Sequence, residues 1–310
     1  MFNRRFLRIK VFQALYAFQQ DAKSSRKIHE KALFNSLSKT YDIYVFLLKF
    51  VTDFNFYLRK DLDSKTFKHF PDKEHINDLN ALLNNKVFLK FELNETLEKL
   101  QPGWTDAEEN FKNILADLRK SSLLKEYTSK ETHTFAEDRK FVSEMFEHLT
   151  GNSELFNQII EEQFINWEDD EVIVILAILK SIHSIKENKK IDFVIKFEDI
   201  LSEDKEFMSE LYAFTIDNDK EYLSLIADKT KNWEAERIAL VDMLLMKMAL
   251  CEILKFPQIP VKVSINEYLE LAKIYSTPNS HGFINGVLDK IQLDLRGSNQ
   301  INKTGRGLVE

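Results

Sequence analysis

The chain has 310 residues, of which 44% are hydrophobic and 30% charged, with 7 glycines and 5 prolines. This composition excludes low-complexity, collagen-like and disulfide-framework proteins and is typical of a globular, mostly helical protein with one large domain or two smaller ones. The formal net charge of −7 argues against a nucleic-acid-binding coat over the whole molecule, but a local cationic surface is compatible with it.

The cysteine and hydropathy patterns indicate the compartment. Cys251 is the single cysteine and lies in an apolar run, so we expect a core residue in a reducing cytosol. No uncharged apolar run approaches the roughly 18 residues that cross a membrane. The basic start lacks the serine enrichment of a transit peptide and the apolar core of a secretory signal. We therefore expect a cytoplasmic protein without a membrane partner.

The first segment, residues 1–22, is predicted to be one basic amphipathic helix. One side carries a hydrophobic stripe from Leu7 to Phe18, and another side carries Arg5, Arg8, Phe12 and Tyr16. Cations and flat rings on one face suit phosphates and unstacked bases. The alternative is that the two rings belong to the core and the arginines are solvated, and helical spacing alone does not exclude it.

The middle of the chain shows helical patterns without a chemical motif. Residues 23–135 are predicted to form an extra helical region whose Lys and Glu residues make a solvated face. Neither a metal-ligand cluster nor a catalytic triad is recognisable, so we expect no cofactor, no metal and no catalytic residue.

An internal repeat follows when the chain is shifted by 66 residues, which places 141–168 over 207–234. Eight positions then agree without gaps, whereas random pairing would give roughly two. We expect two related helical hairpins, the first within 136–205. A duplication and convergence on similar packing both explain the pattern.

The helix predicted near residues 236–254 is apolar nearly all round, as expected at the centre of a bundle. Its charged residues Asp242, Lys247 and Glu252 cannot share one solvent face, because they lie about 140° apart on the helical wheel. At least one must be paired internally or covered by another molecule.

Two further helices are predicted towards the C-terminus. Ser264 and Glu267 have the spacing of a capping box at the start of the first. Pro278 ends that helix, and Asn279 and Ser280 offer caps for the next one. We call residues 276–283 the elbow. It would present side chains at a helix N-terminus, where free N–H groups favour an anion such as phosphate. The alternative is a purely structural turn.

These segments resemble the NusB family of transcription antitermination factors. The resemblance rests on "NRRFLRIKVFQALY", "MLLMKMALCEIL", "PVKVSINEYLELAK" and "SHGFINGVLDK", which occur in the family's order over residues 1–20 and about 232–291. It implies a non-enzymatic, all-α protein that binds boxA RNA of ribosomal RNA leaders together with NusE, a small-subunit ribosomal protein, and joins the elongating RNA polymerase.

Residue by residue, the resemblance implies two RNA-facing patches and one partner-facing helix. The first patch comprises Arg4, Arg5, Arg8, Gln13 and Tyr16, and the second comprises Asn279, Ser280, His281 and Phe283. Asp242 and Lys247 would face NusE. The family has an acidic residue at 279 and a lysine at 282, where this chain has Asn279 and Gly282. The two changes offset each other in charge.

Other functions remain open. NusB-like domains also precede RNA methyltransferase domains, but the segment after Ile291 holds no Gly-rich cofactor loop behind a strand. A scaffold in ribosomal RNA maturation is a further alternative. We expect an all-α fold with extra helices inserted between the N-terminal helix and a C-terminal bundle at 206–295. A disordered tail is expected at 296–310.

Overall fold

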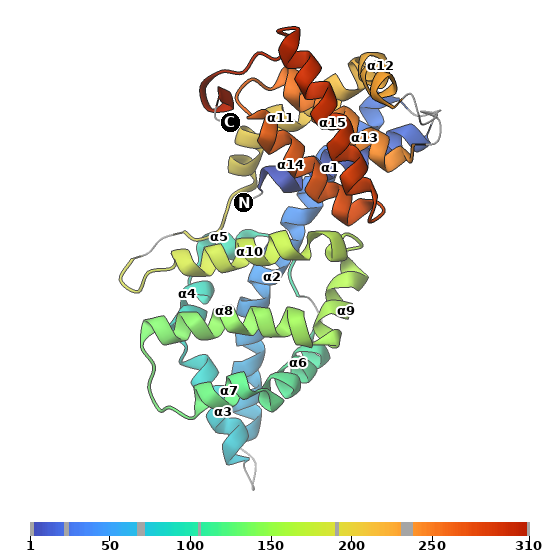
Figure 1. Ribbon diagram of the computed structural model, residues 1–310. Coiled ribbons are helices and arrows are strands. Elements are labelled where there is room, and N and C mark those ends of the chain that lie inside the picture. Colours follow the sequence, from blue (N-terminus) through green and yellow to red (C-terminus); the bar gives the residue numbers. More distant parts are fainter. Residues whose placement is uncertain are drawn as a thin grey trace. The chain divides into compact units, whose positions relative to one another are not determined.

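A computed structural model describes residues 3–21, 25–66, 72–104, 107–189, 192–230 and 238–308. In these ranges the regular structure is helical and contains no strand, which confirms the all-α fold class. The chain divides into two compact units: residues 37–199 form one, and residues 2–36 with 200–310 form the other. The N-terminal helix thus packs with the C-terminal helices in one unit, and the extra helices lie between them along the sequence (Figure 1).

The inserted unit is built around the later part of α2 (Arg26–Thr66). The remaining helices of this unit are α3 (Lys73–Leu83), α4 (Lys86–Glu92), α5 (Glu95–Lys99), α6 (Glu108–Lys120), α7 (Ser122–Thr128), α8 (Phe135–Asn152), α9 (Glu154–Gln163) and α10 (Trp167–Ser184).

Stacked rings form the core of the inserted unit. Trp104 stacks on Phe46 with ring centroids 4.5 Å apart, and its indole Nε1 donates to the Phe46 carbonyl at 2.9 Å. Phe50 contacts Phe111 and Phe156 in the same cluster. These rings bury large apolar areas while the one indole donor stays satisfied.

The second unit contains α1 (Arg4–Gln20), the start of α2 and all helices from α11 onwards. These are α11 (Phe197–Asp217), α12 (Asp219–Lys229), α13 (Leu240–Lys255), α14 (Val261–Tyr275), α15 (Ser280–Gly297) and the short 3₁₀ helix η2 (Gly305–Leu308). Helix α13 packs against α1, α12, α14 and α15 and is the centre of this unit.

Helix α13 confirms the expectation for its charged residues. Asp242, Lys247 and Glu252 are all buried, and each is paired inside the unit. Their partners come from three other helices: Ser276 and Ser280 bind Asp242, Asp219 binds Lys247, and Arg8 binds Glu252.

The two repeat segments share some contacts. Asn152 and Asn218 each donate from Nδ2 to the carbonyl four residues earlier, and Ile160 and Ile226 are both fully buried. The matched residues 232–234 lie outside the described part of the chain.

Two places near the C-terminus bear on the sequence predictions. Helix α14 begins at Val261, so Ser264 does not cap it; its hydroxyl donates to the buried Glu252 carboxylate at 2.7 Å. Residues 298–308, within the tail predicted to be disordered, make specific contacts: Thr304 donates its N–H to the Pro257 carbonyl at 3.0 Å, and Gly307 packs on the same carbonyl.

None of the helices in the described ranges combines the length and the apolar character needed to cross a bilayer.

Candidate nucleic-acid interface

The first turn of α1 concentrates positive charge. Asn3 caps the helix by accepting the Phe6 N–H at 2.8 Å, and Arg4 and Arg5 follow directly, with no acidic residue in that turn. Cations at this end oppose the helix dipole, whose positive pole lies at the N-terminus. This turn is therefore unfavourable for the stability of the helix and favourable for binding an anion.

Arg5 is half-exposed and bound by a carboxylate. Its Nε and Nη2 donate to the two Glu267 oxygens at 2.9 Å each, and 43% of the Arg5 side chain is exposed. The hydrogen bond to Glu267 raises the pKa of Arg5. The remaining guanidinium edge faces solvent, where a phosphate can share it.

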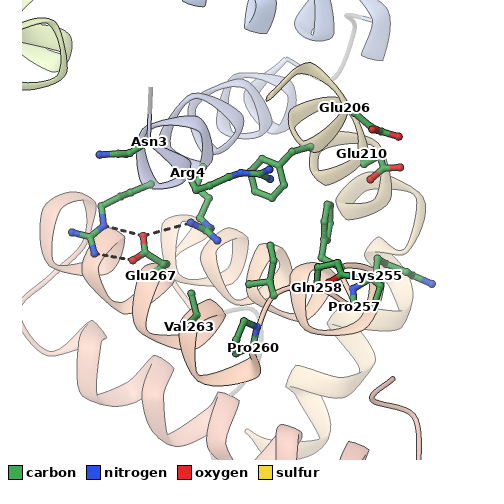
Figure 2. Close-up of a pocket in the computed structure, with 15 residues that line it drawn as sticks. Asn3, Arg4, Glu206, Glu210, Lys255, Pro257, Gln258, Pro260, Val263 and Glu267 are labelled. Atoms are coloured by element: carbon green, nitrogen blue, oxygen red, sulfur yellow. Dashed lines mark hydrogen bonds and ion pairs between the residues drawn. The ribbon is translucent and has the colours of Figure 1, made fainter. Parts of the chain in front are cut away.

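Arg4 lies on the wall of a groove. Its guanidinium carbon is 4.3 Å from the Phe207 ring centroid, and its Nε is 3.7 Å from Asp204. The groove has a volume of about 990 Å³ and lies between α1, α11 and the loop from Phe256 to Pro260 (Figure 2). Three glutamates, Glu206, Glu210 and Glu267, line the groove together with the arginines, so its charge is mixed.

Arg8 does not belong to this exposed surface, which corrects the sequence prediction. Its Nε and Nη2 donate to Glu252 at 2.8 and 2.7 Å, and 3% of its side chain is exposed. Burial would lower the pKa of Arg8, but the hydrogen bonds and charge of Glu252 outweigh it and raise the pKa.

Glu252 is the centre of a satisfied buried network. Besides Arg8, it accepts from Ser264 at 2.7 Å and from the Tyr268 hydroxyl at 3.2 Å. Four donors fill the capacity of a carboxylate, so the buried charge has no missing partner. This network fixes α1 against α13 and α14.

The other end of α1 lies near the elbow. Phe12 contacts Tyr275 with ring centroids 5.2 Å apart, and Tyr16 follows one turn later with 39% exposure. Since Arg5 meets Glu267 and Phe12 meets Tyr275, α1 and α14 run in the same direction. Of the two predicted ring positions, Phe12 is core and Tyr16 is surface, so neither sequence interpretation holds for both.

Asp242 holds the elbow. Its carboxylate accepts from the Ser276 hydroxyl and from the Ser280 hydroxyl, the latter at 2.8 Å. Lys247 binds Asp219 at 2.5 Å and is also buried. Asp242 and Lys247 are therefore both bound inside this unit, and their contact with NusE stays a prediction; Ser280 lies inside the elbow rather than on its surface.

The elbow presents a second set of exposed or half-exposed groups. Asn279 and Gly282 are exposed, His281, Phe283 and Gln13 of α1 are half-buried, and open space surrounds Gly282.

Glu270 connects the arginine end with the elbow electrostatically. Its pKa is lowered chiefly by the hydrogen bond from Lys273 and, to a smaller extent, by the charges of Arg5 and His281. On α14, Glu270 lies between Glu267, which binds Arg5, and the C-terminal end of the helix, where the elbow begins.

Comparison with known proteins supplies the family. The model of the NusB family matches residues 174–293, from within α10 to within α15. The transcription antitermination protein NusB of Finegoldia magna is 35% identical over 105 residues, which cover 77% of that protein and 34% of this chain. The chain belongs to the NusB family.

Two other NusB proteins match comparable stretches. That of Salinibacter ruber is 46% identical over 105 residues, covering 66% of its length and 34% of this chain. That of Chloroherpeton thalassium is 38% identical over 127 residues, covering 60% of its length and 39% of this chain. This chain thus spans less than two thirds of either relative. No solved structure matches it.

Sequence reasoning missed the carboxylates that bind the arginines of this NusB-family chain. Glu252 lies near the end of the quoted "MLLMKMALCEIL" segment and Glu267 lies in "INEYLELAK", so both belong to the segments that carry the family resemblance. A cation pattern at one end of the chain does not reveal which acid, some 250 residues away, will bind it.

Proposed function

We propose that this NusB-family chain is a transcription antitermination factor that binds boxA-type RNA of ribosomal RNA leaders together with NusE and acts on the elongating RNA polymerase. The observation that carries the proposal is the first turn of α1, where Arg4 and Arg5 remain half-exposed at a helix N-terminus beside the groove. No catalytic step is assigned to the chain.

The residues divide into contact and positioning roles. Arg4 and Arg5 would neutralise phosphates, and Tyr16 would stack on an unpaired base. At the elbow Asn279, His281 and Phe283 would contact the same strand, with Gln13 between the two sets. Arg8 and Ser280, which are buried, would position α1 and the elbow and would not touch RNA.

The local charge balance explains why a partner would matter. Asp204 and Glu267 offset part of the charge of Arg4 and Arg5, so the sequence-independent phosphate term is small. Affinity must then come from base contacts and from a second protein. On this proposal, NusE supplies part of the affinity that the phosphate contacts lack.

The experiment is fluorescence anisotropy with a labelled boxA-like single strand and a scrambled strand of equal length, each with and without NusE. We expect preference for the boxA-like strand and tighter binding with NusE. Arg5→Ala should weaken binding several-fold. Arg59→Ala is a matched control, because Arg59 is similarly exposed and binds Glu92 in the inserted unit.

Equal affinity for both strands under both conditions would overturn the proposal. An equal loss in Arg5→Ala and Arg59→Ala would overturn the assigned surface.

A second candidate is a scaffold role in ribosomal RNA maturation. The supporting observation is the inserted unit, since the family match begins only at residue 174 and leaves most of 37–199 unmatched. Retained RNA binding together with loss of another partner, when that unit is removed, would favour this function for the insertion.

A further inference from the structure

A second depression in the same unit has an unusual charge pattern. It has a volume of about 590 Å³ and is formed by the start of α14, the end of α15 and the C-terminal segment. Three cationic side chains line it, from Lys262, Arg296 and Lys303. Among its described lining residues there is no Asp or Glu; the other polar ones are Gln292, Asn299, Asn302 and Thr304. We call this depression the Lys262 pocket.

This charge pattern contrasts with the surroundings of the arginines in α1. The chain has a net charge of −7, and Arg4, Arg5 and Arg8 each lie beside a carboxylate. Lys262 is exposed and makes no ion pair with any described residue. A cationic pocket without lining acids in an acidic protein favours an anionic ligand over simple solvation.

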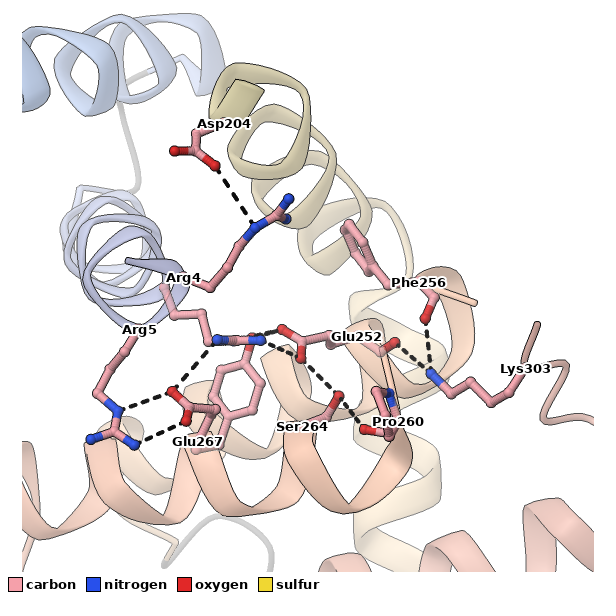
Figure 3. Close-up of polar contacts among 11 residues, drawn as sticks. Arg4, Arg5, Asp204, Glu252, Phe256, Pro260, Ser264, Glu267 and Lys303 are labelled. Atoms are coloured by element: carbon pink, nitrogen blue, oxygen red, sulfur yellow. Dashed lines mark hydrogen bonds and ion pairs between the residues drawn. The ribbon is translucent and has the colours of Figure 1, made fainter. Parts of the chain in front are cut away.

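The C-terminal segment is fixed in place as one wall of this pocket. The Lys303 ammonium donates to the Phe256 carbonyl at 2.9 Å and the Glu252 carbonyl at 3.3 Å, at the end of α13 (Figure 3). The Thr304 hydroxyl accepts from Gln258 at 3.2 Å. At Gly307 an added Cβ would lie 1.9 Å from the Pro257 carbonyl oxygen, so only glycine fits there.

Lys303 keeps most of its charge at neutral pH. Burial lowers its pKa to about 8, while the charge of Glu252 opposes that shift. Its ammonium donates to the Glu252 and Phe256 carbonyls, the charge of the Glu252 carboxylate acts on it, and Lys262 and Arg296 line the same pocket. Its ammonium therefore supplies positive charge from the pocket wall.

Helix α14 connects the pocket with the surface described above. Val261 and Lys262 line the pocket, Glu267 binds Arg5, and Tyr275 lies beside Phe12 near the elbow. At 1.5 Å per residue, its 15 residues span about 22 Å. The loop before it, Phe256 to Pro260, lines the groove of Arg4 and also carries the C-terminal segment.

We propose that the Lys262 pocket binds a backbone phosphate of the same single-stranded RNA, so that the strand runs from the elbow past Arg5 and then crosses the exposed face of α14 to Lys262 and Arg296, because Lys262 lies about 140° around the helix from Glu267. This inference rests on the proposed RNA function. A polyanion fits better than a free phosphate ion, because the pocket adjoins the α14 surface and offers neutral amides and hydroxyls rather than an enclosed anion cage.

The test measures how RNA affinity depends on salt in the full chain. Each lost phosphate contact lowers the slope of log K against log salt by about 0.7 for a single strand, or roughly five-fold in affinity at 0.1 M salt. We expect this loss for Lys262→Ala and about twice the slope change for Lys262→Ala with Arg296→Ala. Lys290→Ala is the control, since Lys290 is an exposed lysine of α15 outside the pocket.

A second variant removes the wall without changing charge. Gly307→Ala should displace the C-terminal segment and weaken RNA binding to a similar extent as the double variant, with unchanged helix content by circular dichroism. Gly151→Ala is its control, because nothing lies within 4 Å of an added Cβ there. If the Gly307→Ala variant loses helix content, the salt slope of the Lys262→Ala variant alone tests the proposal.

Wild-type slopes in Lys262→Ala and in the double variant, with Arg5→Ala still weakened, would overturn the pocket assignment and leave the proposed function standing. Absence of preferential RNA binding by the wild-type chain would instead remove the proposed function. Inorganic phosphate is the separate probe: tight calorimetric binding of phosphate that Lys262→Ala abolishes, without any change in RNA slope, would overturn the RNA assignment.

Discussion

Three arginines in the first eight residues have three different environments. The Arg4 guanidinium lies over the Phe207 ring, and Arg5 forms an ion pair with Glu267 at the surface. Arg8 forms a buried ion pair with Glu252. A buried pair of this kind stabilises little by itself, but loss of one partner leaves an uncompensated charge. Arg8 and Glu252 therefore bear on stability, whereas Arg4 and Arg5 bear on binding.

The first prediction concerns the buried pair. Glu252→Gln should destabilise the unit that contains α13 by about 3–5 kcal/mol, because Arg8 then stays charged without a counter-ion. Urea unfolding followed by circular dichroism measures this. A double replacement, Arg8→Met with Glu252→Met, should cost less than the single change. If the single change cost less than about 1 kcal/mol, the buried-pair account would be wrong.

The second prediction concerns Gly282, where the family has lysine. Gly282→Lys should strengthen RNA binding and steepen the salt slope by about 0.7, since one phosphate contact is added. Open space at this position leaves room for the side chain. Gly151→Lys in the inserted unit adds the same charge elsewhere, and an equal gain in both variants would show that only net charge matters.

At the residue scale, the sequence pattern identified the residues on this side of α1 but not which of them are buried and which are exposed. Helical spacing placed Arg5 and Arg8 on one face together with Phe12 and Tyr16. The structure separates them, because Arg8 and Phe12 meet α13 and α14 while Arg5 and Tyr16 reach the surface. Which residues of this face are buried depends on the helices that pack against α1. Those helices, α13 and α14, come from the other end of the chain.

At the scale of elements, the elbow between α14 and α15 depends on α13. Ser276 and Ser280, which begin and end the turn, both donate to Asp242. Local turn chemistry predicted the elbow from Pro278 and its neighbours. The hydrogen bonds to Asp242 were not predictable from the turn sequence, because that sequence does not show which acidic residue of a neighbouring helix will accept them.

The third prediction tests this tie. Asp242→Ala should weaken RNA binding several-fold although Asp242 touches no RNA, because the Asn279 to Phe283 segment loses its anchor. Amide hydrogen exchange in the elbow should become faster in the same variant. Lys247→Met is the control on the same helix, as Lys247 binds Asp219 away from the elbow. Unchanged exchange in Asp242→Ala would contradict the anchoring role.

The C-terminal segment shows the limit of composition as a predictor. The polar stretch after Leu295 has the composition of a disordered tail, yet Lys303, Thr304 and Gly307 each meet a defined partner at the α13–α14 loop. Carbonyls at the end of a helix accept such donors readily. These specific contacts offset the conformational entropy that the segment loses on ordering. Composition alone does not reveal them.

For the whole molecule, every residue proposed to meet RNA lies in the unit of 2–36 and 200–310. The ends of the insertion are close within that unit. The start of α2 runs beside α11, with the Lys205 ammonium 5.7 Å from the Phe34 ring centroid. All-α class and insertion were predictable from periodicity and the positions of the family motifs. The inserted boundaries were not, since α2 continues through the first of them.

The fourth prediction follows from that proximity. Replacing residues 38–198 by a short Gly/Ser linker should leave a folded helical unit that binds RNA as tightly as the full chain, because a few flexible residues can span the gap. Anisotropy and circular dichroism provide the two readouts. A folded product that no longer binds RNA would show that the insertion contributes to the RNA surface.

The most direct measurement is photo-crosslinking of a boxA-like single strand to the full chain, followed by mass spectrometry of the crosslinked peptides. The account predicts crosslinks at Tyr16 and in the peptide that contains His281 and Phe283, with competition by unlabelled boxA-like strand. Crosslinks confined to residues 37–199, with none at either end of α14, would contradict it.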